Sequence, residues 1–225
     1  LAESFAARAE AAVRERGRFT VALTGGSGPT EAYALLAREP YLSRIPWDGV
    51  HLFWGDERCV PPAHPRSNFG AAHALFVGRV PIPAANVHRM RGELPPGEGA
   101  CAYAGELGRV FEPGMPRFDL VHLGLGPDGH VCSLFPFTAP LLERGATVAN
   151  NLLVAESEWR ITLTFPVLNH ARRVEFISPG AGKAAVVRRV LRGPLDPMQI
   201  PAQLVRPVDG ELAWVIDAAA ASGLD

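Results

Sequence analysis

One histidine stands two residues after an aspartate in a glycine-rich segment, and this pair is the clearest candidate for acid–base chemistry in the chain. The segment runs from Gly124 to His130, reads GLGPDGH and follows an apolar run. Because histidine changes charge near pH ~6.5, its neutral form is the natural general base at neutral pH. We expect His130 to be that base. Asp128 then either orients the imidazole or braces the turn, and the sequence is compatible with both roles.

The glycines of this segment also have the spacing of a dinucleotide-binding loop, G-x-G-x-x-G. That motif requires a helix directly after the loop and an acidic residue about 20 positions later. Here Pro136 and Pro140 follow closely, and no acidic residue ends a later strand at that distance. The sequence therefore predicts no nucleotide cofactor, and we expect the chemistry to rest on a base without any cofactor.

A second glycine-rich segment has the composition of a phosphate-binding loop. It reads TGGSGPT from Thr24 to Thr30 and leads from an apolar run into a predicted helix. Glycines allow the backbone to approach an anion closely, and free N–H groups at a helix start suit a phosphate. We expect Gly25, Gly26 and Ser27 to contact a phosphate. The alternative is a plain turn that caps the helix.

The segment after the next apolar run carries a candidate phosphate clamp. Arg58 stands close to the end of that run, and the fork of a guanidinium matches phosphate oxygens. Ser67 and Asn68 have the residue types of a helix cap and form a second candidate anion site. For Glu57 and Arg66 we favour a solvated, charged loop.

Lys183 is the only lysine among the 22 lysine and arginine residues of the chain. Its segment, Pro179 to Ala184, resembles a P-loop, but Ile177 stands where the first glycine belongs and Ala184 replaces the Ser or Thr. Nucleoside triphosphate binding is therefore not supported. A compact ammonium group at a helix start still suits a phosphate, whereas the alternative is an ordinary surface lysine.

The composition restricts the class of protein. The 225 residues are 48% hydrophobic and 20% charged, with a net charge of −1, which excludes a disordered chain and argues against a general nucleic-acid binder. No apolar run approaches the ~20 residues that span a bilayer. Cys59, Cys101 and Cys132 form no CxxC pair, and neither an acid pair nor a histidine cluster suggests a metal. We expect a cytoplasmic monomer or small homo-oligomer that binds a small phosphorylated molecule but neither nucleic acid nor membrane.

Most of these candidate residues follow predicted strands. Apolar runs predict strands over 19–23, 50–54, 118–125, 147–154, 161–165, 174–178 and 212–216. Helices are predicted over 2–16, 29–38, 68–76, 100–111 and 183–192, with an alanine-rich helical tail and a loop over 80–97. The alternation predicts an α/β fold: one domain over 1–225 with an open, mainly parallel, doubly wound, Rossmann-like sheet and helices on both faces. Ligands of such sheets bind beyond the carboxyl ends of the strands.

Several segments resemble the 6-phosphogluconolactonase family, in the family's order along nearly the whole chain. They are Leu23–Ser27, Asp56–Arg58 with Ser67 and Asn68, Leu123–Pro136, and elements of the stretch from Arg160 to Ala184. The resemblance implies an α/β fold shared with glucosamine-6-phosphate deaminases. It also implies hydrolysis of 6-phospho-D-glucono-1,5-lactone to 6-phospho-D-gluconate, a step of the oxidative pentose phosphate pathway. His130 would then activate water beside the lactone carbonyl while the loops hold the phosphate.

Two alternatives stay open at this point. Deaminases of the same fold carry an acid where this chain has Phe135 and tend to carry Tyr where it has Arg58, so both differences favour the lactonase. A non-catalytic sugar-phosphate sensor is the second alternative, although a sensor would not need His130. The lactonases usually have Thr in place of Gly28, so a hydroxyl contact is either lost or supplied by Thr30.

Overall fold

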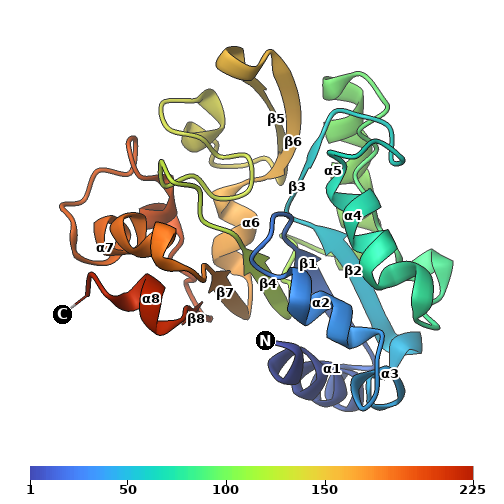
Figure 1. Cartoon of the computed structure of the whole chain (residues 1–225). Coiled ribbons are helices and arrows are strands. Elements are labelled where there is room, and N and C mark those ends of the chain that lie inside the picture. Colours follow the sequence, from blue (N-terminus) through green and yellow to red (C-terminus); the bar gives the residue numbers. More distant parts are fainter. Residues whose placement is uncertain (225) are drawn as a thin grey trace.

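The computed structural model describes residues 1–224 and contains two β-sheets of different construction (Figure 1). The larger sheet is parallel throughout and has the strand order β2-β1-β4-β7-β8. Its strands are β1 (Phe19–Leu23), β2 (Val50–Trp54), β4 (Leu120–Leu123), β7 (Arg173–Ile177) and β8 (Glu211–Val215). The smaller sheet is antiparallel, with the order β3-β6-β5, and comprises β3 (Asp56–Arg58), β5 (Val148–Leu153) and β6 (Glu158–Leu163).

Both faces of β2, β1, β4 and β7 are buried, as their apolar residues predict, whereas the edge strand β8 is partly exposed. Alternate side chains of one strand enter different cores: Val21 and Leu23 pack into the first core, and Ala22 packs into the second. The first core lies under α1 (Ala2–Arg16), α2 (Thr30–Leu36), α3 (Tyr41–Arg44) and α4 (Asn68–Leu75). The second lies under α5 (Pro96–Phe111), α6 (Phe165–His170), α7 (Ala184–Arg192) and the smaller sheet. The doubly wound α/β fold predicted from the sequence is confirmed.

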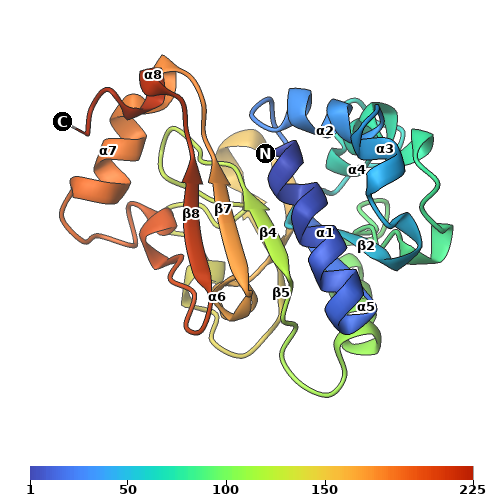
Figure 2. The same cartoon turned by 90° about the horizontal axis from the view of Figure 1, so that it is seen from below.

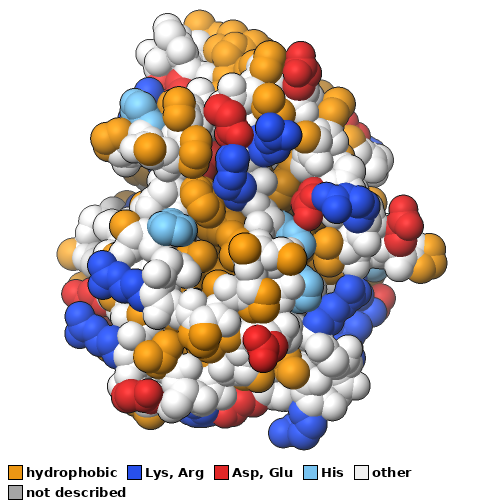
Figure 3. All heavy atoms as spheres, turned by 90° about the vertical axis from the view of Figure 1, so that its right-hand side faces the viewer, with side chains coloured by type: hydrophobic (Ala, Val, Ile, Leu, Met, Phe, Trp, Pro, Cys, Tyr) orange, Lys and Arg blue, Asp and Glu red, His pale blue; other side chains and the backbone are white. Residues whose placement is uncertain are grey.

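Figure 2 shows β8, β7 and β4 side by side, with α1 running next to them. The chain ends with α8 (Ala218–Ala221), whose first turn is capped by Asp217. On the face shown in Figure 3, acidic and basic side chains alternate with apolar ones and form no continuous basic field. No helix within residues 1–224 is both long and apolar enough to cross a membrane.

The structure corrects the sequence prediction in the smaller sheet. The strands expected over 147–154 and 161–165 exist, but they pair with each other in an antiparallel hairpin instead of joining the parallel sheet. A parallel neighbour requires a long crossover, whereas only a short turn ending at Ser157 joins these two strands. Asp56–Arg58, expected to be a loop, forms β3 and pairs with β6.

The two sheets meet at the carboxyl ends of β1, β2, β4 and β7. Gly55, directly after β2, donates its N–H to the Leu23 carbonyl of β1 at 2.9 Å and accepts from the Leu163 N–H of β6 at 2.8 Å. This residue therefore links the last residue of a parallel strand to the antiparallel sheet. As a result, the loops after four parallel strands and the side chains of β3 and β6 surround one space.

Candidate active site

A cavity of about 350 Å³ occupies this space. Its walls are the loop after β1 (24–29), β3 with Asn68, the loop after β4 (124–132), the end of β7 and Lys183, together with Arg160 from β6. Six predicted site residues therefore line one cavity, as expected for an open parallel sheet, and they are Gly25, Gly26, Ser27, Arg58, His130 and Lys183. Asp128 and Ser67 are not among its lining residues.

His130 and Asp128 form a close pair at this cavity. The Asp128 carboxylate oxygen Oδ1 lies 2.6 Å from His130 Nδ1 and also accepts the His130 backbone N–H at 3.1 Å. Asp128 thus contacts both the ring and the turn, so the two roles considered for it coexist. Burial alone would raise the pKa of the Asp128 carboxyl, but the hydrogen bonds from His130 outweigh burial and lower that pKa.

The ionised carboxylate determines which nitrogen of the imidazole carries hydrogen. A carboxylate only accepts hydrogen bonds, so Nδ1 is the protonated nitrogen and Nε2 of the neutral ring keeps its lone pair. The His130 ring stacks on Phe135, with ring centroids 3.9 Å apart. Gly126 makes room for the ring, because a Cβ at that position would lie 2.1 Å from His130 Nδ1. The ring is therefore held by Asp128 and Phe135, and its Nε2 has no hydrogen-bond partner within residues 1–224.

The loop after β1 presents backbone donors to the cavity. Within residues 1–224, no intramolecular hydrogen bond is found from the N–H groups of Gly25, Gly26 or Ser27. A Cβ on Gly25 would lie 2.1 Å from Asn68 Oδ1, and Gly26 has a φ of +84°, so both positions require glycine. The loop can therefore bring free N–H groups close to an anion.

The structure gives a reason for the unusual Gly28. A Cβ at this position would lie 3.2 Å from the carbonyl oxygen of Ile177, at the end of β7. Thr30 does not fill the place of the missing hydroxyl in this structure, because its Oγ1 donates to the Gly26 carbonyl at 3.3 Å. The presence of Gly28 instead of Thr is thus accompanied by close packing of the loop against β7.

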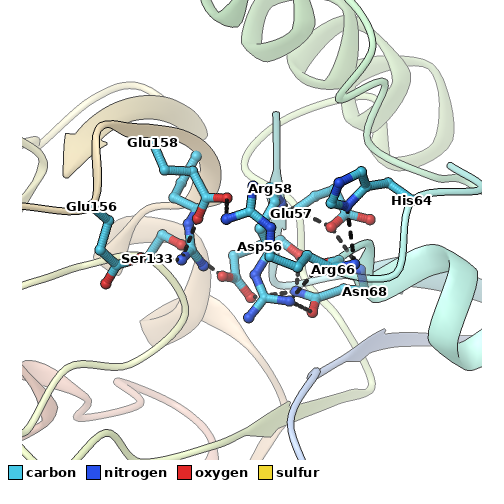
Figure 4. A network of polar contacts seen from close by, with 10 residues as sticks. Asp56, Glu57, Arg58, His64, Arg66, Asn68, Ser133, Glu156 and Glu158 are labelled. Atoms are coloured by element: carbon cyan, nitrogen blue, oxygen red, sulfur yellow. Dashed lines mark hydrogen bonds and ion pairs between the residues drawn. The ribbon is translucent and has the colours of Figure 1, made fainter. Parts of the chain in front are cut away.

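Arg58 and Lys183 bring two cationic groups to the same cavity. Arg58 Nη1 donates to the Arg66 carbonyl at 2.6 Å and to Asn68 Oδ1 at 3.0 Å, as Figure 4 shows. Its buried Nε has no partner among the described residues. Lys183 Nζ donates to the Leu125 carbonyl at 2.7 Å, which ties it to the loop that carries His130.

Ser67 forms the predicted helix cap, but it lies outside the cavity. It is buried, does not line the cavity, and caps α4 by accepting the Gly70 N–H at 2.9 Å. Its hydroxyl donates to Glu57 at 2.9 Å. The start of α4 is thus already occupied by a carboxylate of the chain, and Ser67 supports that carboxylate instead of contacting a ligand.

The interpretation of Glu57 as a solvated charge is wrong, because its side chain is 2% exposed. Its carboxylate accepts the backbone N–H groups of Arg58 and Asn68 at 2.8 and 2.7 Å (Figure 4). It also accepts the backbone N–H of Phe69 at 2.8 Å. Burial raises the pKa of Glu57, although these hydrogen bonds oppose the shift. Arg66 is exposed and pairs with Glu158, which agrees with the predicted charged loop.

Two charged cavity residues were not among the predicted site residues. Arg160 lies in β6 directly opposite Arg58 of β3 and forms ion pairs with Glu156 at 2.9 Å and Glu158 at 2.5 Å. Asp56 accepts a hydrogen bond from the Ser133 hydroxyl at 2.6 Å. In the sequence, Arg160 stood out only as the start of a stretch that resembles the lactonase family, and its position opposite Arg58 depends on strand pairing.

The described residues offer no metal centre. Among residues 1–224, no group of three or more His, Cys, Asp and Glu side chains could hold a metal ion. Cys132 lines the cavity, and burial raises the pKa of its thiol well above the ordinary value. The arrangement places the imidazole of His130 beside cationic side chains and a glycine-rich loop.

Comparisons with known proteins agree with this geometry. Residues 1–214 match the family described as glucosamine-6-phosphate isomerases/6-phosphogluconolactonase. The chain is 41% identical over 219 residues to 6-phosphogluconolactonase of Synechocystis sp., which covers 95% of this chain and 88% of that protein. It is 42% identical over 216 residues to 6-phosphogluconolactonase of Homo sapiens, covering 92% and 81%. The crystal structure of 6-phosphogluconolactonase from Thermotoga maritima has a TM-score of 0.83 at 29% identity, covering 96% and 93%. The chain therefore belongs to the family of glucosamine-6-phosphate isomerases and 6-phosphogluconolactonases.

Proposed function

We propose that this protein hydrolyses 6-phospho-D-glucono-1,5-lactone to 6-phospho-D-gluconate, with His130 as the general base. The lactonase relatives support the reaction, which belongs to the oxidative pentose phosphate pathway. The observation that carries the catalytic role is the 2.6 Å contact between His130 Nδ1 and Asp128, which leaves Nε2 free at a cavity lined by cationic groups.

The phosphate is held away from the reacting carbon. The N–H groups of Gly25, Gly26 and Ser27 donate to its oxygens, and Arg58 and Lys183 supply charge-assisted hydrogen bonds. Binding of this remote group then places the lactone carbonyl beside the base.

The base acts twice in the reaction. His130 Nε2 takes a proton from water as the water oxygen bonds to the lactone carbonyl carbon. The tetrahedral intermediate then breaks its bond to the ring oxygen, which receives the proton from the imidazolium. Asp128 favours the imidazolium between these steps, because a carboxylate stabilises a neighbouring cation.

The arginine pair across β3 and β6 supports an anionic substrate. Arg58 and Arg160 face each other in the register of the two strands, and like charges placed opposite are destabilising. Glu156 and Glu158 neutralise the Arg160 side of the pair. Because Arg58 has no carboxylate partner among the described ion pairs, a phosphate in the cavity would compensate its charge.

No observation favours the deaminase or sensor alternatives. Phe135, which stands in the place of the deaminase acid, packs its ring against His130. A binding protein would not need an imidazole with an oriented lone pair. We further propose a cytoplasmic enzyme with one lactonase domain over residues 1–225, a small phosphorylated lactone as its partner, and a monomeric or small homo-oligomeric state.

The direct test generates the lactone in situ and follows 6-phosphogluconate formation above the spontaneous rate. The wild-type protein and His130→Ala are measured together, with ammonia release from glucosamine 6-phosphate as a second assay. Enzyme-dependent hydrolysis that is lost in His130→Ala supports the proposal. Ammonia release without lactone hydrolysis would move the protein to the deaminases. Binding of 6-phosphogluconate with neither activity would indicate a sensor.

A further inference from the structure

The hydroxyl of one buried tyrosine joins the phosphate-binding loop to the interior of the parallel sheet. Tyr33 of α2 is 3% exposed and does not line the cavity. Its Oη accepts the backbone N–H of Thr24, the first residue of the loop after β1, at 3.2 Å. On its other side, Oη lies 3.0 Å from Nδ1 of the fully buried His122 of β4.

The direction of these hydrogen bonds follows from their ends. The Thr24 N–H can only donate, and burial raises the pKa of Tyr33, so the phenol keeps its own proton to donate to His122 Nδ1. His122 then carries its hydrogen on Nε2. This nitrogen lies 3.7 Å from Glu175 Oε2 of β7. Hydrogen-bond donation thus runs in one direction, from Thr24 through Tyr33 to His122, whose Nε2 lies on the side of Glu175.

Glu175, at the other end of this series of contacts, is itself held by two side chains. Glu175 is 1% exposed and accepts from Arg173 Nε at 2.6 Å and from the Ser4 hydroxyl of α1 at 3.0 Å. Burial lowers the pKa of His122 to about 4, so this histidine is neutral at pH 7 and keeps the lone pair that Tyr33 needs.

Thr24 also contacts the second loop of the cavity, but through its side chain and not through the N–H that Tyr33 accepts. Its Oγ1 accepts the Gly124 N–H at 3.0 Å, and Gly124 begins the loop that carries His130. The next residues after Thr24 are Gly25 and Gly26, which line the cavity and are the proposed phosphate donors. A displacement of Thr24 would therefore move phosphate donors directly.

We propose that Tyr33, oriented by His122, is a positioning residue that sets the phosphate-binding loop through the Thr24 N–H. This inference rests on the proposed phosphate role of that loop. Loss of the hydroxyl leaves a part-buried N–H without its acceptor, and a hydrogen bond of this kind corresponds to about a 3- to 10-fold change in an equilibrium constant.

The decisive variant is Tyr33→Phe, which keeps the packed ring and removes only Oη. We expect KM for the phosphorylated lactone and Kd for 6-phosphogluconate each to rise about 3- to 10-fold. Hydrolysis of unphosphorylated glucono-1,5-lactone, measured as kcat/KM, is expected to stay at the wild-type value. A tyrosine that only stabilised the fold would not separate the two substrates in this way.

Tyr103→Phe is the matched control. Tyr103 of α5 is also buried, and its Oη is hydrogen-bonded to the N–H and carbonyl of Trp54, each at 3.0 Å. Its loss is expected to lower Tm as Tyr33→Phe does, but to leave Kd for 6-phosphogluconate unchanged. An equal rise of Kd in both variants would refute the proposal, as would an unchanged Kd in Tyr33→Phe.

Variants of His122 test whether its hydrogen bond with Tyr33 orients the tyrosine hydroxyl. His122→Leu removes the acceptor of Tyr33 and is expected to raise Kd as Tyr33→Phe does, whereas His122→Gln keeps an amide acceptor and is expected to raise it less. Equal Kd values in these two variants would contradict the role of His122. Kd is measured by calorimetry, so a protein that binds 6-phosphogluconate without turnover would refute the lactonase function and still test Tyr33.

Discussion

Gly126→Ala offers a sharp test of the geometry proposed for the base. Gly126 does not have a positive φ, so the backbone accepts alanine at this position. The new Cβ, however, would lie 2.1 Å from His130 Nδ1, 2.2 Å from Cε1 and 2.7 Å from Asp128 Oδ1. All three atoms belong to side chains, so the expected response is a movement of the His130–Asp128 pair and not a rearrangement of the backbone.

The required movement of the His130 ring is larger than a reacting group tolerates without a loss of rate. Non-bonded heavy atoms are best separated by about 3.5 Å or more, so the ring must retreat by about 1.4 Å from its position. A misplacement of about 1 Å in a reacting group can lower a rate by about 10²-fold. We therefore expect kcat for the phosphorylated lactone to fall by about 10²-fold. Kd for 6-phosphogluconate is expected to change little, because the loop after β1 is untouched.

The assay measures lactone hydrolysis above the spontaneous rate and, separately, Kd by calorimetry. Gly105→Ala in α5 is the matched control, since a Cβ there meets nothing within 4 Å. It is expected to leave both quantities unchanged and to raise stability slightly, as alanine favours a helix over glycine. A folded Gly126→Ala protein with wild-type kcat would show that the position of the His130 ring does not control the reaction.

Three other changes test separate parts of the reasoning. His130→Ala is expected to lower kcat by about 10²–10⁴-fold with Kd retained, and near-normal turnover would remove His130 as the base. Lys183→Ala is expected to raise KM by about 10-fold or more through the loss of a charge-assisted phosphate contact, and an unchanged KM would exclude it from the phosphate site. The pKa of His122, lowered to about 4 by burial, predicts a pH effect on stability. Between about pH 6.5 and pH 4 the unfolded chain binds a proton that the native chain rejects, so native stability falls as pH falls. In this window, wild type is expected to lose about 1.4 kcal/mol of unfolding free energy per pH unit relative to His122→Gln. Urea titrations at several pH values measure both free energies, and a difference that stays constant with pH would contradict this.

Local features of the chain were predictable because they depend on near neighbours. Asp128 and His130 are two residues apart, so their contact is made within one turn. The loop after β1 could be located from its glycines, and the parallel strands from their apolar runs. Lys183 was predicted to contact a phosphate because it is the only lysine and stands at a helix start, and it lies on the cavity wall.

Contacts between distant segments were not predictable from spacing. Glu57 looks like a surface charge in the sequence, and its burial depends on the packing of α4 against β3. The same packing turned Ser67 inward. Arg160 comes to lie opposite Arg58 only because β6 pairs antiparallel with β3, a register that neither segment contains by itself.

The sequence by itself thus determined the fold class, the contact between His130 and Asp128 and the glycine-rich loops, because backbone freedom and short-range hydrogen bonds are encoded within a few residues. Only the tertiary structure decided which charged side chains line the cavity and which are buried behind its walls. Tyr33 and His122 are 89 positions apart, yet they meet in the core and hold Thr24. Such contacts arise because burial of both faces of the sheet selects the partners of each polar group, and that selection depends on the whole chain.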